Sequence, residues 1–141
     1  MDAKDFHGFA DELSNSIMTY QEANHRTIIS RLYYGAFLSV QKWLETHYKQ
    51  DYLIFKGSTH IRITKCLSHL AEKYNQPQIE DLAEQLRNFK GDRVTADYHL
   101  HIPVGDVNVQ IAKQKRDEVM QAFYLVQLLR ITMPNPQVQT K

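Results

Sequence analysis

Apolar residues recur at intervals of three and four along most of the chain, which is the spacing of one face of an α-helix. No sustained two-residue alternation bounded by Asn-Gly or Asp-Gly turns is found, so strands have no place in the pattern. The pattern therefore predicts an all-α fold.

Two helices are predicted in the first third of the chain, over residues 3–20 and 23–48. Gly35 lies inside the second helix, where glycine costs about 1 kcal/mol relative to alanine. We therefore expect another helix to approach closely at Gly35. The second helix has a wide apolar stripe, which consists of Ile28, Ile29, Leu32, Tyr33, Ala36, Phe37, Val40, Trp43 and Leu44.

Three further helices are predicted from their start signals. Ser58 or Thr59 is an N-cap candidate for the third, and Pro77 suits the first turn of the fourth. Asp106 is expected to cap a fifth helix that reaches about Ile131. The inward residues are expected to be Ile63, Cys66, Leu67, Leu70 and Tyr74, then Ile79, Leu82, Ala83, Leu86 and Phe89, then Ile111, Ala112, Val119, Ala122, Phe123 and Val126.

Length and composition favour one folded domain. The chain has 141 residues, of which 43% are hydrophobic and 23% charged, as in ordinary globular proteins. We assign residues 1–133 to a single helical domain and residues 134–141 to a flexible tail. The formal charge of +1 provides no overall field for nucleic acid or an anionic membrane, so any such binding requires a local patch.

The cellular setting is expected to be the cytoplasm. Cys66 is the only cysteine, so an intramolecular disulfide is excluded and a reducing compartment fits best. The first residues lack an apolar signal segment, and no window approaches eighteen continuous apolar residues, so no membrane association is expected.

A cation interrupts the apolar stripe of the fourth helix. Arg93 lies seven residues after Leu86 and therefore on nearly the same face. Asp97, four residues later, could form an ion pair with Arg93 along the helix. A purely structural ion pair is one interpretation.

A second interpretation is chemical, because polar groups are concentrated just after Arg93. Tyr98, His99 and His101 follow within eight residues. Imidazole accepts and donates protons near neutral pH, and arginine holds phosphate through paired hydrogen bonds, so the set suits phosphodiester chemistry. Pro103 should end the helix near His99, and in a continuous helix His99 would lie about 120° around from Arg93. A shared site then requires a bend or a second chain.

The residues around Arg93 can be assessed for two kinds of binding site, for a metal ion and for RNA. His99 and His101 with one nearby carboxylate are too few ligands on their own, so a metal site would have to recruit ligands from other helices. Arg87, Lys90 and Arg93 recur every three residues and are RNA-binding candidates. The alternative for these cations is a solvated helix face.

Three segments together resemble a known family. Ser30-Arg31-Leu32-Tyr33-Tyr34-Gly35-Ala36-Phe37 resembles the Ser-Arg-x-Tyr-Tyr-x-x-Phe signature of HEPN domains, which are small helical proteins of prokaryotic toxin and defence systems. Gly57-Ser58-Thr59-His60 is similar to the opening of the next helix in that family. The segment from Arg93 to Tyr98 resembles its Arg-x-x-Ala-Asp-Tyr motif. The likeness covers residues 24–130.

The resemblance implies a four- or five-helix up-and-down bundle that forms a homodimer. It also implies metal-independent RNA cleavage, with Arg93 and His99 as the catalytic pair and Asp97, Tyr98 and His101 in support. No cofactor is expected. The protein would act as a toxin or defence effector, restrained by a partner such as a nucleotidyltransferase-like antitoxin. The alternative is a non-catalytic HEPN module that binds a defence-system subunit, another partner protein or a nucleotide.

Overall fold

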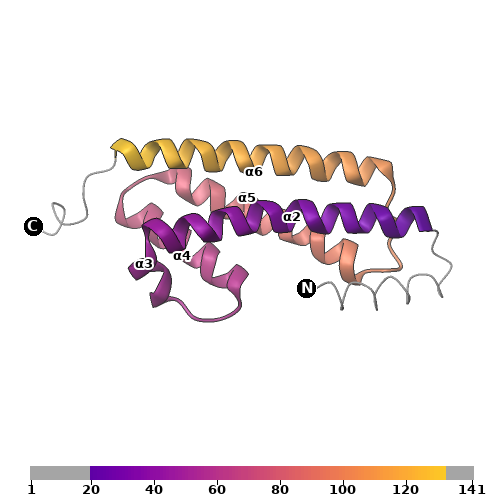
Figure 1. Ribbon diagram of the computed structural model, residues 1–141, viewed down its shortest axis with the longest axis horizontal. Coiled ribbons are helices and arrows are strands. Elements are labelled where there is room, and N and C mark those ends of the chain that lie inside the picture. Colours follow the sequence, from indigo (N-terminus) through magenta and orange to yellow (C-terminus); the bar gives the residue numbers. More distant parts are fainter. Residues whose placement is uncertain (1–19, 133–141) are drawn as a thin grey trace, which may run out of the picture. The chain divides into compact units, whose positions relative to one another are not determined.

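The computed structural model describes residues 20–132, which form helices joined by loops and contain no strand (Figure 1). The expected all-α fold class is confirmed, and the helices pack into a helical bundle. The helix predicted over residues 3–20 and the tail at 134–141 lie outside the described residues. The helices are α2 (Tyr20–His47), α3 (Lys49–Ile54), α4 (Thr59–Lys73), α5 (Pro77–Tyr98) and α6 (Asp106–Thr132).

The described residues divide into two compact units. The first contains residues 20–36 of α2, residues 88–98 of α5, the following loop and α6 as far as Arg116. The second contains the remainder of α2, α3, α4, the beginning of α5 and the end of α6. The candidate site residues from Arg93 to His101 all belong to the first unit.

The buried face of α2 is narrower than the sequence predicts. Seven residues of the expected stripe are buried, but Ile28 is 38% exposed, so its inward assignment is wrong. Successive helical residues are about 100° apart, and the face set by Ile29 and Tyr33 leaves Ile28 at its edge. The buried residues are Ile29, Tyr33, Ala36, Phe37, Val40, Trp43 and Leu44.

The expected close approach at Gly35 is also wrong. Gly35 is exposed, and a Cβ added there would meet no atom within 4 Å. Neighbouring Ala36 is buried instead, so the packing surface of α2 passes beside the glycine.

Replacing Gly35 by alanine should therefore raise the free energy of unfolding by about 1 kcal/mol, because alanine favours the helix and has free space. Urea unfolding followed by circular dichroism measures the change. Gly57→Ala is the matched control and should lower stability, because Gly57 has a φ of +115° that alanine rarely adopts. Destabilisation by Gly35→Ala would contradict the open environment.

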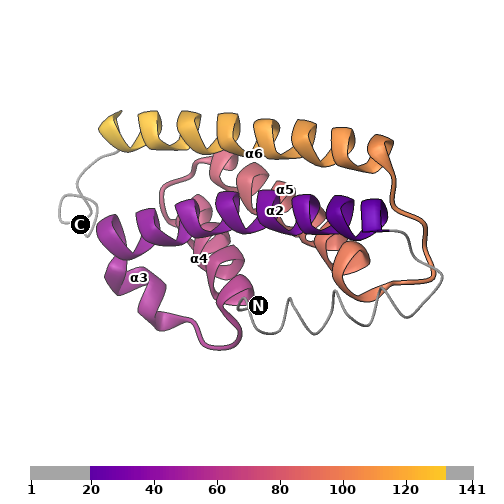
Figure 2. The ribbon, with the colours of Figure 1, turned by 45° about the vertical axis from the view of Figure 1, so that its right-hand side comes forward.

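The short helix α3 was not predicted, because six residues show no helical period and only Tyr52 is buried. It packs against α4, to which residues 55–58 connect it (Figure 2). The Asp51 carboxylate lies 3.1 Å from both His69 Nε2 and Lys73 Nζ of α4. These polar contacts join α3 to α4 in addition to the buried Tyr52 ring, over which Arg62 of α4 lies.

Helix α4 confirms the expected N-cap and inward face. The Ser58 hydroxyl accepts a hydrogen bond from the Ile61 amide at 3.4 Å. Cys66 is fully buried among the predicted core residues, and burial raises the pKa of its thiol to about 12. The inward residues Ile63, Cys66, Leu67, Leu70 and Tyr74 are all buried.

Asn75 turns the chain between α4 and α5. Its φ of 53° is left-handed, and the Asn75 and Gln76 amides donate to the carbonyls of Glu72 and Ala71. These two bonds form a Schellman-type helix end. Pro77 then begins α5 as predicted, and the inward residues Ile79, Leu82, Ala83, Leu86 and Phe89 are buried.

Helix α6 begins at Asp106, so the predicted cap is its first residue. The Asn108 side chain accepts from the Gly105 amide at 2.9 Å, which ties the loop to the first turn. Ile111 is 45% exposed, and its inward assignment is wrong. The buried face follows Val109 and Ala112 instead, which leaves Ile111 rotated outward.

Candidate functional site

Helix α5 ends where Pro103 predicts. Tyr98 is its last residue, and the His99 amide still donates to the Thr95 carbonyl at 3.1 Å. The Ile102 amide donates in turn to the His99 carbonyl at 3.1 Å. His99 and His101 thus lie beyond the helix, as expected, in the loop that leads to α6.

Arg93 is held by two polar neighbours. Its Nε lies 3.2 Å from the Asp97 carboxylate, in an ion pair that lacks good hydrogen-bond alignment. Its Nη2 donates a hydrogen bond to the Tyr34 hydroxyl of α2. Neither contact uses Nη1, and 15% of the side chain is exposed. Asp97 and Tyr34 therefore fix the orientation of the guanidinium through Nε and Nη2, and Nη1 remains as a donor for a ligand.

Tyrosine rings surround the same guanidinium. Its central carbon lies 5.7 Å, 5.1 Å and 5.7 Å from the ring centroids of Tyr33, Tyr34 and Tyr98. Tyr33 is buried against Phe89, and burial raises the pKa of its phenol, which therefore stays protonated. Tyr98 is 59% exposed. Aromatic faces attract a cation, so these rings add to its fixed position.

Asp97 lies beneath Arg93 and is 2% exposed. The Ser30 hydroxyl of α2 donates to its Oδ2 at 3.3 Å. Burial raises the pKa of the Asp97 carboxyl, while Arg93 and the Ser30 hydrogen bond act in the opposite direction. The cluster of Ser30, Asp97 and Arg93 thus joins α2 to α5, as the structural interpretation of the ion pair expects.

The two histidines occupy a different environment. His99 and His101 are exposed, and their ring centroids lie 6.0 Å apart. The contacts of Arg93 include Asp97 and Tyr98 but neither histidine. The structure therefore brings together Arg93, Asp97 and Tyr98, and leaves His99 and His101 as a separate exposed pair.

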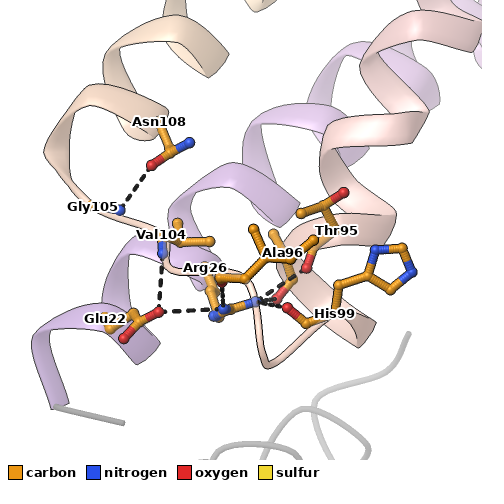
Figure 3. A network of polar contacts seen from close by, with 9 residues as sticks. Glu22, Arg26, Thr95, Ala96, His99, Val104, Gly105 and Asn108 are labelled. Atoms are coloured by element: carbon orange, nitrogen blue, oxygen red, sulfur yellow. Dashed lines mark hydrogen bonds and ion pairs between the residues drawn. The ribbon is translucent and has the colours of Figure 1, made fainter.

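Sequence reasoning missed Arg26, which is 1% exposed and fixes the end of α5 (Figure 3). Its Nη1 donates to the carbonyls of Thr95, Ala96 and His99 at 3.1, 3.0 and 3.3 Å. Its Nη2 donates to the Ile102 carbonyl. The Thr95 and His99 carbonyls also accept from the His99 and Ile102 amides, so Arg26 adds further donors at a helix end where intrahelical donors run out.

Glu22 extends this contact to the rest of the loop. One carboxylate oxygen lies 3.3 Å from Arg26 Nη2 and accepts from the Val104 amide at 2.9 Å. A sequence signal existed, because Arg26 precedes buried Ile29 by three residues and follows Glu22 by four. This is the same signal, a cation in an apolar stripe, that identified Arg93.

His25 makes a further contact between α2 and the start of α6. Its Nε2 lies 2.9 Å from the Asp106 carboxylate, and its side chain is 13% exposed. Together with Glu22 and Arg26, it places three successive polar contacts on the first two turns of α2. The loop is therefore held at both ends.

The predicted RNA-binding cations differ in their surroundings. Arg87 lies 3.3 Å from Glu80 and donates to the Ser68 hydroxyl at 3.0 Å. Lys90 is partly exposed. An ion pair as exposed as Arg87 with Glu80 contributes little to stability, so Arg87 can exchange partners.

Within residues 20–132, no three His, Cys, Asp or Glu side chains gather closely enough to hold a metal ion. No helix in the same range has the length and apolar character needed to cross a bilayer. Comparison with known proteins finds no matching family model, no matching curated protein and no matching solved structure.

Proposed function

We propose that the chain is a HEPN-type endoribonuclease that cleaves RNA without a metal ion and acts as a toxin or defence effector. The observation that carries the proposal is the orientation of Arg93 by Asp97 and Tyr34, which leaves Nη1 for a phosphate. An arginine held in advance stabilises transition-state charge without reorganising during the reaction. The exposed Tyr98 ring offers a stacking surface for a base beside it.

The His99 imidazoles of two copies of the chain supply the proton transfers. One imidazole removes the proton of a ribose 2′-hydroxyl, and the oxygen attacks the adjacent phosphorus. The bond from phosphorus to the 5′-oxygen breaks, and a second imidazole protonates the leaving oxygen. The products are a 2′,3′-cyclic phosphate and a 5′-hydroxyl, so protons and bonds balance without a cofactor.

A homodimer suits this chemistry. The attacking and leaving oxygens lie on opposite sides of the phosphorus, so one imidazole does not serve both. Arg93 also lacks a contact with His99 inside one chain. A second copy would bring another imidazole to the phosphate, which gives the homodimer a chemical purpose.

The second candidate is a non-catalytic HEPN module that binds a nucleotide or a partner protein, such as a nucleotidyltransferase-like antitoxin or a defence-complex subunit. The burial of Asp97 and its contacts with Ser30 and Arg93 favour it. A structural role, in which the cluster joins two helices, is sufficient to explain these contacts. In this case Arg93 still binds an anion, but no bond is broken.

An RNA cleavage assay in excess EDTA separates the two functions. Wild-type protein should cut single-stranded RNA and leave cyclic phosphate ends, because the mechanism uses only side chains. A 2′-O-methyl RNA of the same sequence is the matched substrate, which should bind but remain intact. Binding of both RNAs without cleavage would favour the module, and cleavage that requires Mg²⁺ would contradict the proposed mechanism.

A further inference from the structure

The end of α5 is fixed from outside its own helix. Arg26 reaches from α2 and donates to four backbone carbonyls between Thr95 and Ile102. One of these carbonyls belongs to His99 itself, and Figure 3 shows the imidazole pointing away from Arg26. Arg26 therefore holds the backbone of His99 while its ring remains accessible.

The fork of Arg26 matches this task in a way that lysine does not. A planar guanidinium presents donors in fixed directions, whereas an ammonium is a compact point charge on a flexible stem. Nη1 serves the last helical turn and His99, and Nη2 serves Ile102 and Glu22. Glu22 then binds the Val104 amide, so one connected set of polar atoms fixes the loop.

We infer that Arg26 and Glu22 are positioning residues for His99, and this inference rests on the proposed cleavage of RNA. Arg26 is not placed to touch the phosphate, since it is 1% exposed and is occupied by carbonyls. The Glu22 carboxylate accepts from the Val104 amide and has the same sign of charge as a phosphate, so it does not bind one. The effect of both residues is on the location of the His99 backbone, from which the imidazole reaches the 2′-hydroxyl.

The magnitude follows from the geometry of proton transfer. A shift of about 1 Å in a catalytic group can lower a rate by roughly 100-fold. Substrate affinity depends instead on Arg93 and on the RNA-binding candidates Arg87 and Lys90, none of which contacts Arg26. Loss of the Arg26 fork should therefore lower kcat and leave KM nearly unchanged.

The test is Arg26→Lys, assayed with single-stranded RNA in EDTA at a temperature where circular dichroism shows every variant folded. We expect kcat to fall by about 10- to 100-fold, with KM within about twofold. Arg62→Lys is the matched control, because Arg62 also donates to a loop carbonyl, that of Phe55, at 3.0 Å. Its kcat should stay within about twofold of wild type.

Amide hydrogen exchange supplies a readout that does not depend on cleavage. The Ile102 and Val104 amides should exchange faster in Arg26→Lys and in Glu22→Ala, whereas those of α4 should not change. Unchanged exchange and an unchanged kcat in Arg26→Lys would overturn the inference while leaving the nuclease intact. A wild type that does not cleave would overturn the proposed function, and with it the catalytic purpose of Arg26.

Discussion

Replacing His99 by alanine should lower the rate of RNA cleavage by about 10²- to 10⁴-fold, the usual contribution of a general base. The imidazole is exposed beyond α5, and its contact is with the ring of His101. Its removal should therefore change the free energy of unfolding by less than about 0.5 kcal/mol. Single-turnover cleavage and urea unfolding of the same preparation measure the two effects.

His47→Ala is the matched control for this prediction. His47 is an exposed histidine at the end of α2, and its ring lies near that of Trp43. This variant should cleave RNA at the wild-type rate. Equal rates for His99→Ala and His47→Ala would remove His99 from the mechanism, and the non-catalytic module would then be the better account.

Replacing Arg93 by alanine should lower the free energy of unfolding by about 3 kcal/mol at neutral pH, because it leaves a buried carboxylate without its cation. Asp97 is 2% exposed and keeps the hydrogen bond from the Ser30 hydroxyl, which does not neutralise its charge. Arg31→Ala, which removes an exposed arginine of α2, should change stability by less than about 0.5 kcal/mol. Urea unfolding of both variants provides the comparison.

The decrease in the free energy of unfolding caused by Arg93→Ala should become larger as the pH rises. Burial raises the pKa of Asp97 above its ordinary value of 3.8, and removal of the opposing Arg93 raises it further. Between the unfolded and folded pKa values the native state binds more protons, so stability falls as pH rises. The cost should be smallest below about pH 3.8 and complete above the folded pKa. A cost that shrinks as pH rises would contradict the burial of an unpaired carboxylate.

The hydrophobic pattern predicted the long helices because their buried faces repeat over many turns. It failed at the edges of those faces, where Ile28 and Ile111 are exposed although neighbouring residues one position away are buried. A step of one residue turns the side chain by about 100°, which a pattern with several apolar neighbours does not resolve. Helix α3 is too short to show any period.

The candidate site was predictable only where its contacts are local in the chain. The Arg93 and Asp97 pair lies within one helical turn, so its spacing is visible in the sequence. The contacts of Arg26 with the end of α5 and the following loop span 69 to 76 residues and depend on how α2 meets the end of α5. No spacing rule reaches across such a separation, although the apolar context of Arg26 marked it as a cation that needs partners.

The burial of Cys66 links the redox chemistry of the chain to the opening of its core. Thiolates rather than thiols react with oxidants and electrophiles, and a pKa of about 12 leaves a very small thiolate fraction at neutral pH. Cys66 of α4 also has no exposed surface, so reagents reach its sulfur only when the packing around α4 opens. Because Cys66 is the only cysteine in the sequence, copies of the folded protein resist disulfide crosslinking. Covalent modification of the Cys66 thiol therefore reports that the protein has unfolded.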